Sequence, residues 1–290
     1  MAIEGLTIIG ESINDSVPST KAMFEAGDIS GILELARSQD AGGAAYIDVN
    51  VGARSPEFMA DLVVQIQQAT AKPLSLDTPD PAIAKAGLSV YRVDRAGGQK
   101  PILNSITVAR DQMWDLYTVC PFRPILLATE LAADGKLIPA RTADQTYQAA
   151  KALVETARNR CPGITNDDLI IDPGIAPIAG DTEGNLKRLI AAMDGIHADP
   201  DLAGVHMSVG LSNFTVMLPS KRKDGTPVKS ALESAFLTIA MPRGLDMIIG
   251  SVKRNYERLS DDHPAMQCLQ AVLQADGFEA LMHVRNFYAG

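Results

Sequence analysis

The 290-residue sequence predicts a single-domain (β/α)8 TIM barrel, and three observations lead to this fold class. Short apolar runs alternate eight times with longer segments whose apolar residues recur at helical spacing. The connections are short, and no change in composition marks a linker. The apolar runs are nearly continuous, as in parallel strands that are covered on both faces. We therefore expect one domain over residues 1–290, with the barrel over about 6–275 and a C-terminal tail over 276–290.

A doubly wound open sheet uses the same alternation and is the alternative fold. It is disfavoured because no Gly-x-Gly-x-x-Gly turn follows the first predicted strand. Eight strand-helix units also close a barrel naturally.

In the first half of the chain, residues 6–10 are apolar and β-branched, and they predict a strand that leads into a polar turn over 11–14. Apolar residues at helical spacing predict a helix over 29–40, which Gly42-Gly43 ends. The same patterns predict further strands at 46–50, 73–77 and 101–105, and helices at 58–69, 81–90 and 110–119.

In the second half, a strand over 124–130 precedes a long helix over 143–160, which ends at Pro162-Gly163. The remaining predicted strands are 169–174, 206–213 and 245–250, and the remaining helices are 185–196, 230–241 and 265–274. The longest polar insertion, 219–227, is interpreted as a solvated loop, with a docking loop as the alternative.

The tail carries an apolar helical face made of Phe278, Leu281, Met282, Val284 and Phe287. We expect this face to pack against the barrel, and a contact between subunits is the alternative.

Composition excludes several classes of protein. The net charge of −9 and the pI near 5.0 disfavour nucleic-acid binding, which needs a basic surface. No apolar run approaches the length of about 20 residues that crosses a membrane, and the N-terminus lacks the pattern of a signal peptide. The three cysteines and four histidines are scattered, without the spacing of a disulfide framework or a metal site. We expect a cytoplasmic protein with no protein-ligated metal.

Polar side chains stand at the ends of six of the eight predicted strands. They are Glu11, Asn14, Asp48, Asn50, Asp77, Asn104, Asp172, Ser212 and Asn213, with Gly210 beside the last two. Any one of them could cap a helix or close an Asx turn. However, Asp77, Asn104 and Asp172 each directly terminate an apolar run. Because the carboxyl ends of barrel strands meet at one mouth, we expect these side chains to converge on a functional site.

The residue types suggest the kind of ligand. A phosphate would need basic residues or a glycine-rich helix N-terminus, and neither is evident after the seventh and eighth strands. A flat heterocycle with an amino-pyrimidinone edge fits better, because it offers N–H donors to a carboxylate and a carbonyl to an amide. Mg²⁺ held by aspartates, together with a phosphorylated substrate, is the alternative.

Six motifs, in order, resemble the pterin-binding family. They are Gly10-Glu11-Ser12-Ile13-Asn14, Ile47-Asp48-Val49-Asn50-Val51-Gly52, Leu76-Asp77, Ile102-Leu103-Asn104-Ser105, Ile170-Ile171-Asp172-Pro173 and Val209-Gly210-Leu211-Ser212-Asn213. Within this family they are most similar to the methyltetrahydrofolate:corrinoid methyltransferases of acetogenic and demethylating systems.

The resemblance implies roles for these residues. Asp77, Asn104 and Asp172 would hydrogen-bond the pterin, and Gly210 and Ser212 would lie against it. Asn213 would be the catalytic amide that reaches N5 of the folate. The remaining four would support the site: Glu11, Asn14, Asp48 and Asn50.

The resemblance also implies the reaction and its partners. A methyl group would move between N5 of (methyl)tetrahydrofolate and the cobalt of a corrinoid (cobalamin), and we favour delivery to tetrahydrofolate. The corrinoid would be carried by a separate protein, since no Asp-x-His-x-x-Gly motif or following cobalamin domain is present. The family further implies a homodimer. The alternatives are a dihydropteroate synthase-like enzyme, which would need basic residues near the last strands, and a non-catalytic pterin-binding protein.

Overall fold

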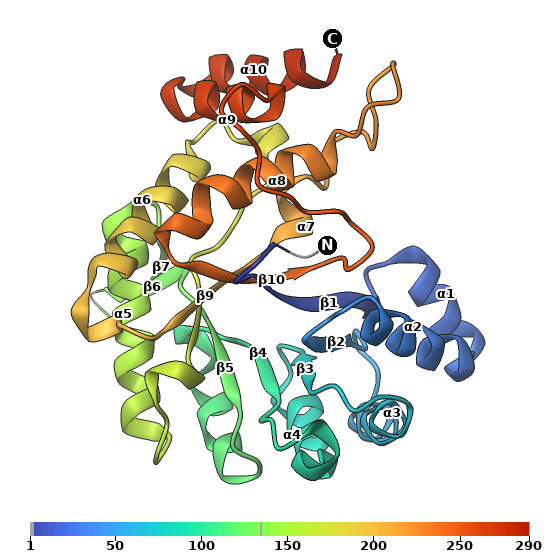
Figure 1. Cartoon of the computed structure of the whole chain (residues 1–290). Helices are drawn as coiled ribbons and strands as arrows, with labels where there is room; N and C mark the ends of the chain where they lie inside the picture. The colour runs from blue at the N-terminus through green and yellow to red at the C-terminus, as the bar shows by residue number, and fades with distance from the viewer. Residues whose placement is uncertain (1–2, 134, 290) are drawn as a thin grey trace.

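A computed structural model describes residues 3–133 and 135–289, and in this part of the chain eight parallel strands close into a barrel. The closed barrel confirms the predicted fold class (Figure 1). Around the barrel the strands follow the order β1-β10-β9-β8-β5-β4-β3-β2. Their bounds are β1 Thr7–Asn14, β2 Tyr46–Asn50, β3 Leu74–Asp77, β4 Ile102–Ile106, β5 Arg123–Leu127, β8 Ile170–Asp172, β9 His206–Gly210 and β10 Leu245–Gly250.

Helices surround the strands (Figure 1). The α-helices are α1 Pro18–Ala26, α2 Ile29–Ala41, α3 Pro56–Ala69, α4 Pro81–Val90, α5 Ala143–Arg160, α6 Asn185–Ala198, α7 Leu211–Phe214, α8 Lys229–Ala240, α9 Pro264–Gln274 and α10 Gly277–Ala289. Short 3-10 helices are η1 Val93–Ala96, η2 Val108–Thr118, η3 Asn166–Asp168, η4 Ile178–Gly180, η5 Pro200–Leu202 and η6 Met241–Arg243. None of the helices among the described residues is long and apolar enough to span a membrane.

Local sequence explains where several helices begin. The side chains of Ser55 and Asp80 accept hydrogen bonds from the first turns of α3 and α4, and a proline follows each of them. Thr142 and Gln145 form a reciprocal capping box at the start of α5. These caps satisfy backbone N–H groups that have no partner within the helix.

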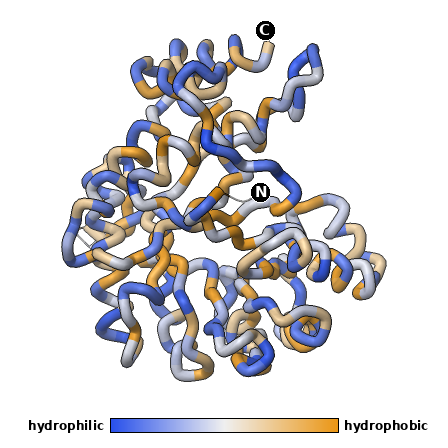
Figure 2. Tube along the Cα trace, in the orientation of Figure 1, coloured by the Kyte–Doolittle hydropathy of each residue, from blue (hydrophilic) through white to orange (hydrophobic). Residues whose placement is uncertain are grey.

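The apolar residues lie in two places. A large cluster packs between the strands and the helices, which accounts for the apolar strands at the centre of Figure 2. A smaller cluster joins side chains of six different strands, and therefore lies inside the barrel: Ile9, Tyr46, Ile102, Ile125, Ile170 and Met247. It fills the barrel interior as a plug, so that any cavity on the axis lies above or below it.

Polar residues of the first unit lie in a strand rather than in the predicted turn over 11–14. The register of β1 on β2 shifts between Gly10 and Ile13, after which Asn14 pairs with Asn50. At this bulge the Ser12 N–H donates to Oε1 of the buried Gln39 on α2 (3.0 Å). The prediction of a turn was wrong because polar side chains in this strand face a cavity instead of solvent.

The other differences lie outside the barrel strands. Helix α1 was not predicted, and the predicted helix 110–119 is the 3-10 helix η2, with a kink at Arg110. The predicted strand 124–130 ends at Leu127, and the chain then forms an antiparallel hairpin of β6 (Glu130–Ala133) and β7 (Lys136–Pro139). The predicted strand 206–213 ends at Gly210, and residues 211–214 form α7.

The insertion and the tail are both ordered elements. Residues Lys221 and Pro227 form an antiparallel bridge within the insertion. The tail is helical, and Val284 and Phe287 are buried as predicted. Phe278 does not belong to the packed face, since it is 73% exposed.

Candidate functional site

A cavity of 480 Å³ opens at the carboxyl ends of the barrel strands, directly above the apolar plug. It is lined by Glu11, Asn14, Ser16, Val17, Asp48, Asp77, Asn104, Ser105, Leu127, Thr129, Asp172, Gly174, Ile175, Gly210, Ser212, Asn213 and Ile249. Its volume suits a small heterocyclic ligand. This is the face of a TIM barrel on which active sites are built.

The pleat of the strands explains how the cavity is lined. Each of the six plug residues stands two positions before a residue of the cavity wall, and side chains two apart in a strand share a face. The wall residues reached in this way are Glu11, Asp48, Asn104, Leu127, Asp172 and Ile249. In β3 and β9 the buried Ser75 and Ser208 precede Asp77 and Gly210 by the same two positions. One inward-facing layer thus receives a residue from every barrel strand among the described residues.

Nine of the ten site residues expected from the sequence line this cavity; the exception is Asn50. Asn50 supports the site from behind, because its Nδ2 donates to Asp77 Oδ2 (2.9 Å) while its Oδ1 accepts from the Gly52 N–H. Asn14 turns its Oδ1 towards Ser16, accepting from the backbone N–H (2.9 Å) and from the hydroxyl (2.6 Å).

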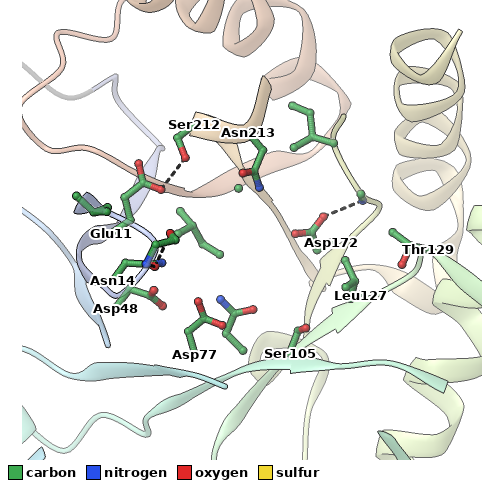
Figure 3. A pocket seen from close by; sticks show the side chains of 17 residues that line it. Glu11, Asn14, Asp48, Asp77, Ser105, Leu127, Thr129, Asp172, Ser212 and Asn213 are labelled. Carbon is green, nitrogen blue, oxygen red and sulfur yellow. Dashed lines mark hydrogen bonds between the residues drawn. The ribbon is translucent and has the colours of Figure 1, made fainter. Parts of the chain in front are cut away.

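One wall of the cavity is acidic. Figure 3 shows Glu11, Asp48 and Asp77 along this wall, with their side chains directed into the cavity. Burial raises the pKa of all three carboxyl groups. For Asp48 the pKa lies well above its ordinary value, because burial is complete and the neighbouring charge of Asp77 adds to it. Neither Asp48 oxygen has a hydrogen-bond partner among the described residues, so protonation is its favoured state.

Asp172 stands on the opposite wall (Figure 3). Its Oδ1 accepts from the Gly174 N–H (2.8 Å), while burial raises its pKa to about 6. Arg188 holds this turn through hydrogen bonds to the carbonyls of Pro173 (3.0 Å) and Gly174 (2.8 Å). Its charge also opposes the rise in the pKa of Asp172.

Helix α7 brings Ser212 and Asn213 over the cavity between these walls (Figure 3). The Ser212 hydroxyl donates to Glu11 Oε2 (2.9 Å), which joins α7 to β1. The Asn213 side chain has no hydrogen-bond partner among the described residues, and its amide folds over Gly210. A Cβ atom at position 210 would lie 2.8 Å from Asn213 Nδ2, so a side chain here would displace the amide from this position.

The site offers many hydrogen-bond acceptors and few cations. No lysine or arginine is among the described residues that line the cavity. Cationic influences come from three arginines behind the walls: the charges of Arg110, Arg188 and Arg254 oppose the rise in the pKa of Asp77, Asp172 and Glu11, respectively. Among the residues with described positions, no group of three or more His, Cys, Asp or Glu could hold a metal ion. The chemistry therefore suits a neutral, donor-rich heterocycle rather than a phosphate.

Sequence reasoning missed eight lining residues: Ser16, Val17, Ser105, Leu127, Thr129, Gly174, Ile175 and Ile249. Leu127 and Ile249 are apolar and gave no chemical signal, but the period of two from Ile125 and Met247 could have placed them. Ser105 directly follows Asn104, and Gly174 directly follows the Asp172-Pro173 motif, so position alone could have suggested both.

Comparison with known proteins gives a family match and a curated relative. The family model described as "Pterin binding enzyme" matches residues 13–250. A curated protein of Eubacterium limosum, the methylcorrinoid:tetrahydrofolate methyltransferase, is 28% identical over 260 residues, which cover 84% of this chain and 84% of that protein.

Solved structures with a similar fold include dihydropteroate synthases. The enzyme of Xanthomonas albilineans in complex with 7,8-dihydropteroate has 17% identity and a TM-score of 0.53, covering 95% of this chain and 96% of that one. The Yersinia pestis enzyme in a sulfonamide complex has 14% identity and a TM-score of 0.57, covering 95% and 97%. At these identities the likeness concerns the fold alone.

Proposed function

Because the chain belongs to the pterin-binding enzyme family, we propose that it is a methyltransferase acting between a corrinoid protein and N5 of tetrahydrofolate. The observation that carries this proposal is the position of the Asn213 amide, over a cavity whose opposite walls bear Asp77 and Asp172. The similarity to the Eubacterium limosum methyltransferase supports the same reaction and the direction towards tetrahydrofolate.

Binding of the pterin follows from the chemistry of the walls. The amino-pyrimidinone edge of a pterin has adjacent N–H donors, which the carboxylates of Asp77 and Asp172 can accept. The amide of Asn104 can donate to the ring carbonyl and accept from a ring N–H. Asn50 fixes the carboxylate of Asp77, so this acceptor is oriented before the ligand arrives.

At N5 the protein must orient the amine and manage one proton. When the corrinoid delivers its methyl group, N5 of tetrahydrofolate forms the new C–N bond and must then lose its proton. The Asn213 amide would hydrogen-bond the protonated amine, and the ionised Glu11, whose raised pKa makes it a better proton acceptor, can take up that proton. In the reverse direction Glu11 or the protonated Asp48 would supply a proton to N5. Positioning of N5 would account for much of the remaining rate.

The corrinoid fits only at the open mouth, because a corrin macrocycle is wider than a pterin and the cavity is closed below by the apolar plug. Asn213 is exposed on this side. Three and four residues further along the chain, Val216 and Met217 are 57% and 66% exposed, and they offer apolar surface to a carrier protein. The proposed partner is therefore a corrinoid protein that covers the mouth. A homodimer stays a prediction, which sedimentation velocity would test.

The experiment mixes the protein with methylcobalamin and tetrahydrofolate, and follows cobalt reduction by absorbance and methyltetrahydrofolate by mass spectrometry. We expect transfer by the wild type. Asp77→Ala and Asn104→Ala should weaken folate binding about tenfold or more, as expected for lost hydrogen bonds to charged or buried partners. Asn213→Ala should mainly lower kcat. Asn286→Ala, an exposed amide on α10, is the matched control and should retain full activity.

Four outcomes contradict the proposal. Absence of methyl transfer in both directions, with or without a corrinoid protein, would show a different activity, and an unchanged rate in Asn213→Ala would remove its role at N5. Condensation of para-aminobenzoate with a pterin pyrophosphate would instead identify a dihydropteroate synthase. The absence of Lys and Arg from the described cavity lining argues against the pyrophosphate that this reaction needs. Tight folate binding without turnover would indicate a non-catalytic binding protein.

A further inference from the structure

The segment that follows Asn213 is attached to the interior face of α8 by two contacts. The rings of Phe214 and Phe236 lie 5.2 Å apart, and the Thr215 hydroxyl donates to Glu233 Oε1 (2.5 Å). Thr215 and Glu233 are both 0% exposed. Helix α7 is only one turn long, so these contacts rather than its own hydrogen bonds hold it in place.

Glu233 also binds the loop that follows β10. Arg254 of this loop forms an ion pair with Glu233 Oε1, and its side chain is 28% exposed. Further along the loop, the Glu257 N–H donates to Ser234 Oγ (3.2 Å) and the Leu259 N–H donates to Thr238 Oγ1 (3.0 Å). One buried carboxylate of α8 therefore connects the mouth loops of two neighbouring barrel strands, β9 and β10.

This carboxylate acts on both ends of α7. At the C-terminal end it holds Thr215, which caps the helix. At the N-terminal end Arg254 lies close enough to Glu11 to lower its pKa, and Glu11 accepts the Ser212 hydroxyl. Asn213 lies between these ends, without a side-chain hydrogen bond to the described residues, so its position depends on the backbone of α7.

Stability alone does not explain a glutamate at this place. Burying a charge is costly, and a buried ion pair can often be replaced by apolar residues of similar volume without loss of stability. Glu233 Oε2 is buried and has no hydrogen-bond partner among the described residues, which adds to the cost. The position of Glu233 is therefore better explained by the segments that it holds in place than by a contribution to the free energy of unfolding.

We propose that Glu233 is a positioning residue, which acts through Thr215 and Arg254 to hold α7 so that the Asn213 amide faces N5 of the bound pterin. The proposal rests on the proposed methyl transfer for its chemistry, but its structural part concerns the order of α7 and can be measured separately. Glu233 is not itself a catalytic residue, because it is not among the residues lining the cavity.

The experiment compares Thr215→Val with Thr215→Ser in the full chain. Valine keeps the volume of threonine but cannot donate to Glu233, whereas serine can. Two readouts are used: hydrogen exchange of residues 211–218, and kcat and KM for tetrahydrofolate with free methylcobalamin as donor. The control is Thr70→Val, because Thr70 at the end of α3 donates to Asp40 Oδ2 at the same 2.5 Å and a lysine, Lys72, lies beside that carboxylate.

We expect Thr215→Val to speed exchange in 211–218 and to lower kcat about tenfold or more, since small misplacements of a catalytic group cost this much. KM should stay within about twofold, because the residues expected to hydrogen-bond the pterin, Asp77, Asn104 and Asp172, lie on other strands. Thr215→Ser should restore both readouts, and Thr70→Val should change neither. The Asn213→Ala/Thr215→Val double variant should be no slower than Asn213→Ala alone, as expected when one residue acts through the other.

The outcomes separate the two proposals. A wild type without methyl transfer refutes the proposed function, while faster exchange in Thr215→Val alone still supports the ordering of α7. Equal exchange in the Val and Ser variants overturns the inference, whatever the activity. In an active enzyme, a kcat unaffected by Thr215→Val, or losses that add in the double variant, also overturn it.

Discussion

The carboxyl group of Asp172 provides a test in which stability and function should change in opposite directions. We predict that Asp172→Asn makes the protein more stable at pH 8 and at the same time weakens folate binding. Asparagine has the same shape as aspartate. Its Oδ1 can still accept the hydrogen bond from the Gly174 N–H, which is 2.8 Å long in the wild type. What the change removes is a charge that burial opposes.

The magnitude follows from the raised pKa. Burial raises the pKa of Asp172 from 3.8 to about 6, so the ionised form disfavours folding by about 3 kcal/mol at a pH above both values. The pKa of this carboxyl is higher in the folded protein than in the unfolded chain. Its contribution to the free energy of unfolding is therefore fully present below pH 3.8 and is lost as the pH rises through about 6. The gain from Asp172→Asn should therefore approach 3 kcal/mol at pH 8 and fall below about 1 kcal/mol near pH 4.

The assay is urea denaturation of wild type and variant between pH 4 and pH 8, combined with calorimetric binding of tetrahydrofolate at pH 7.5. The dissociation constant should rise about tenfold to a hundredfold, because a charged acceptor of the pterin N–H groups is lost. Asp199→Asn is the control of opposite sign. The Lys151 ammonium and the Tyr147 hydroxyl hold the pKa of Asp199 at about 2, so its replacement should destabilise the protein at neutral pH.

Three results would refute this reasoning. If Asp172→Asn were less stable than the wild type at pH 8, the ionised carboxylate would be stabilised by partners that outweigh burial, such as Arg188. If stability increased but folate bound with unchanged affinity, Asp172 would not contact the pterin. A gain in stability that does not vary with pH would show that charge is not its cause.

Two further predictions concern the mouth and the base of the barrel. Gly210→Ala places a methyl group 2.8 Å from Asn213 Nδ2, so it should displace the amide and lower kcat/KM about tenfold with little change in the thermal midpoint; full activity would contradict the close approach. At the base, the hydrogen bond of His206 Nδ1 to Asp246 Oδ2 (2.6 Å) raises the pKa of His206 above 6.5. The stabilisation of the folded protein by protonated His206 is therefore complete below pH 6.5 and is lost as the pH rises through the raised pKa. Asp246→Asn should abolish this pH dependence in urea titrations between pH 5.5 and 9.

Much of the fold was predictable because the barrel repeats one simple pattern. Continuous apolar runs identified the eight strands, and helical spacing identified the long helices; α4 and α5 have the predicted bounds. The polar ends of the strands identified the side of the barrel that holds the cavity. The role of each wall residue in binding or catalysis stays a prediction until the variants are measured.

The remaining features depend on contacts that no local pattern reveals. The polar half of β1 is a strand only because β2 pairs with it and Gln39 satisfies the Ser12 N–H across the bulge. Likewise α7 interrupts an apolar run because Phe214 and Thr215 find partners on α8, which begins 15 residues after Phe214. In the sequence, Glu233 has the position of an ordinary polar residue on an amphipathic helix. Only its complete burial in the structure indicates a special role.

The buried carboxyl groups that suit the cavity to a pterin also lower the stability of the folded protein. Asp48, Asp77 and Asp172 converge in a buried space that opposes their ionisation, and the protein supplies few cations to offset them. A ligand that brings N–H donors removes part of this cost when it binds, so its binding favours ionised Asp77 and Asp172. Neither Asp48 oxygen has a hydrogen-bond partner among the described residues, so Asp48 should stay protonated until it gives a proton to N5 in the direction that starts from methyltetrahydrofolate. The division gives the acidic site two functions: oriented carboxylates hold the ring, and a neutral carboxyl beside them exchanges a proton.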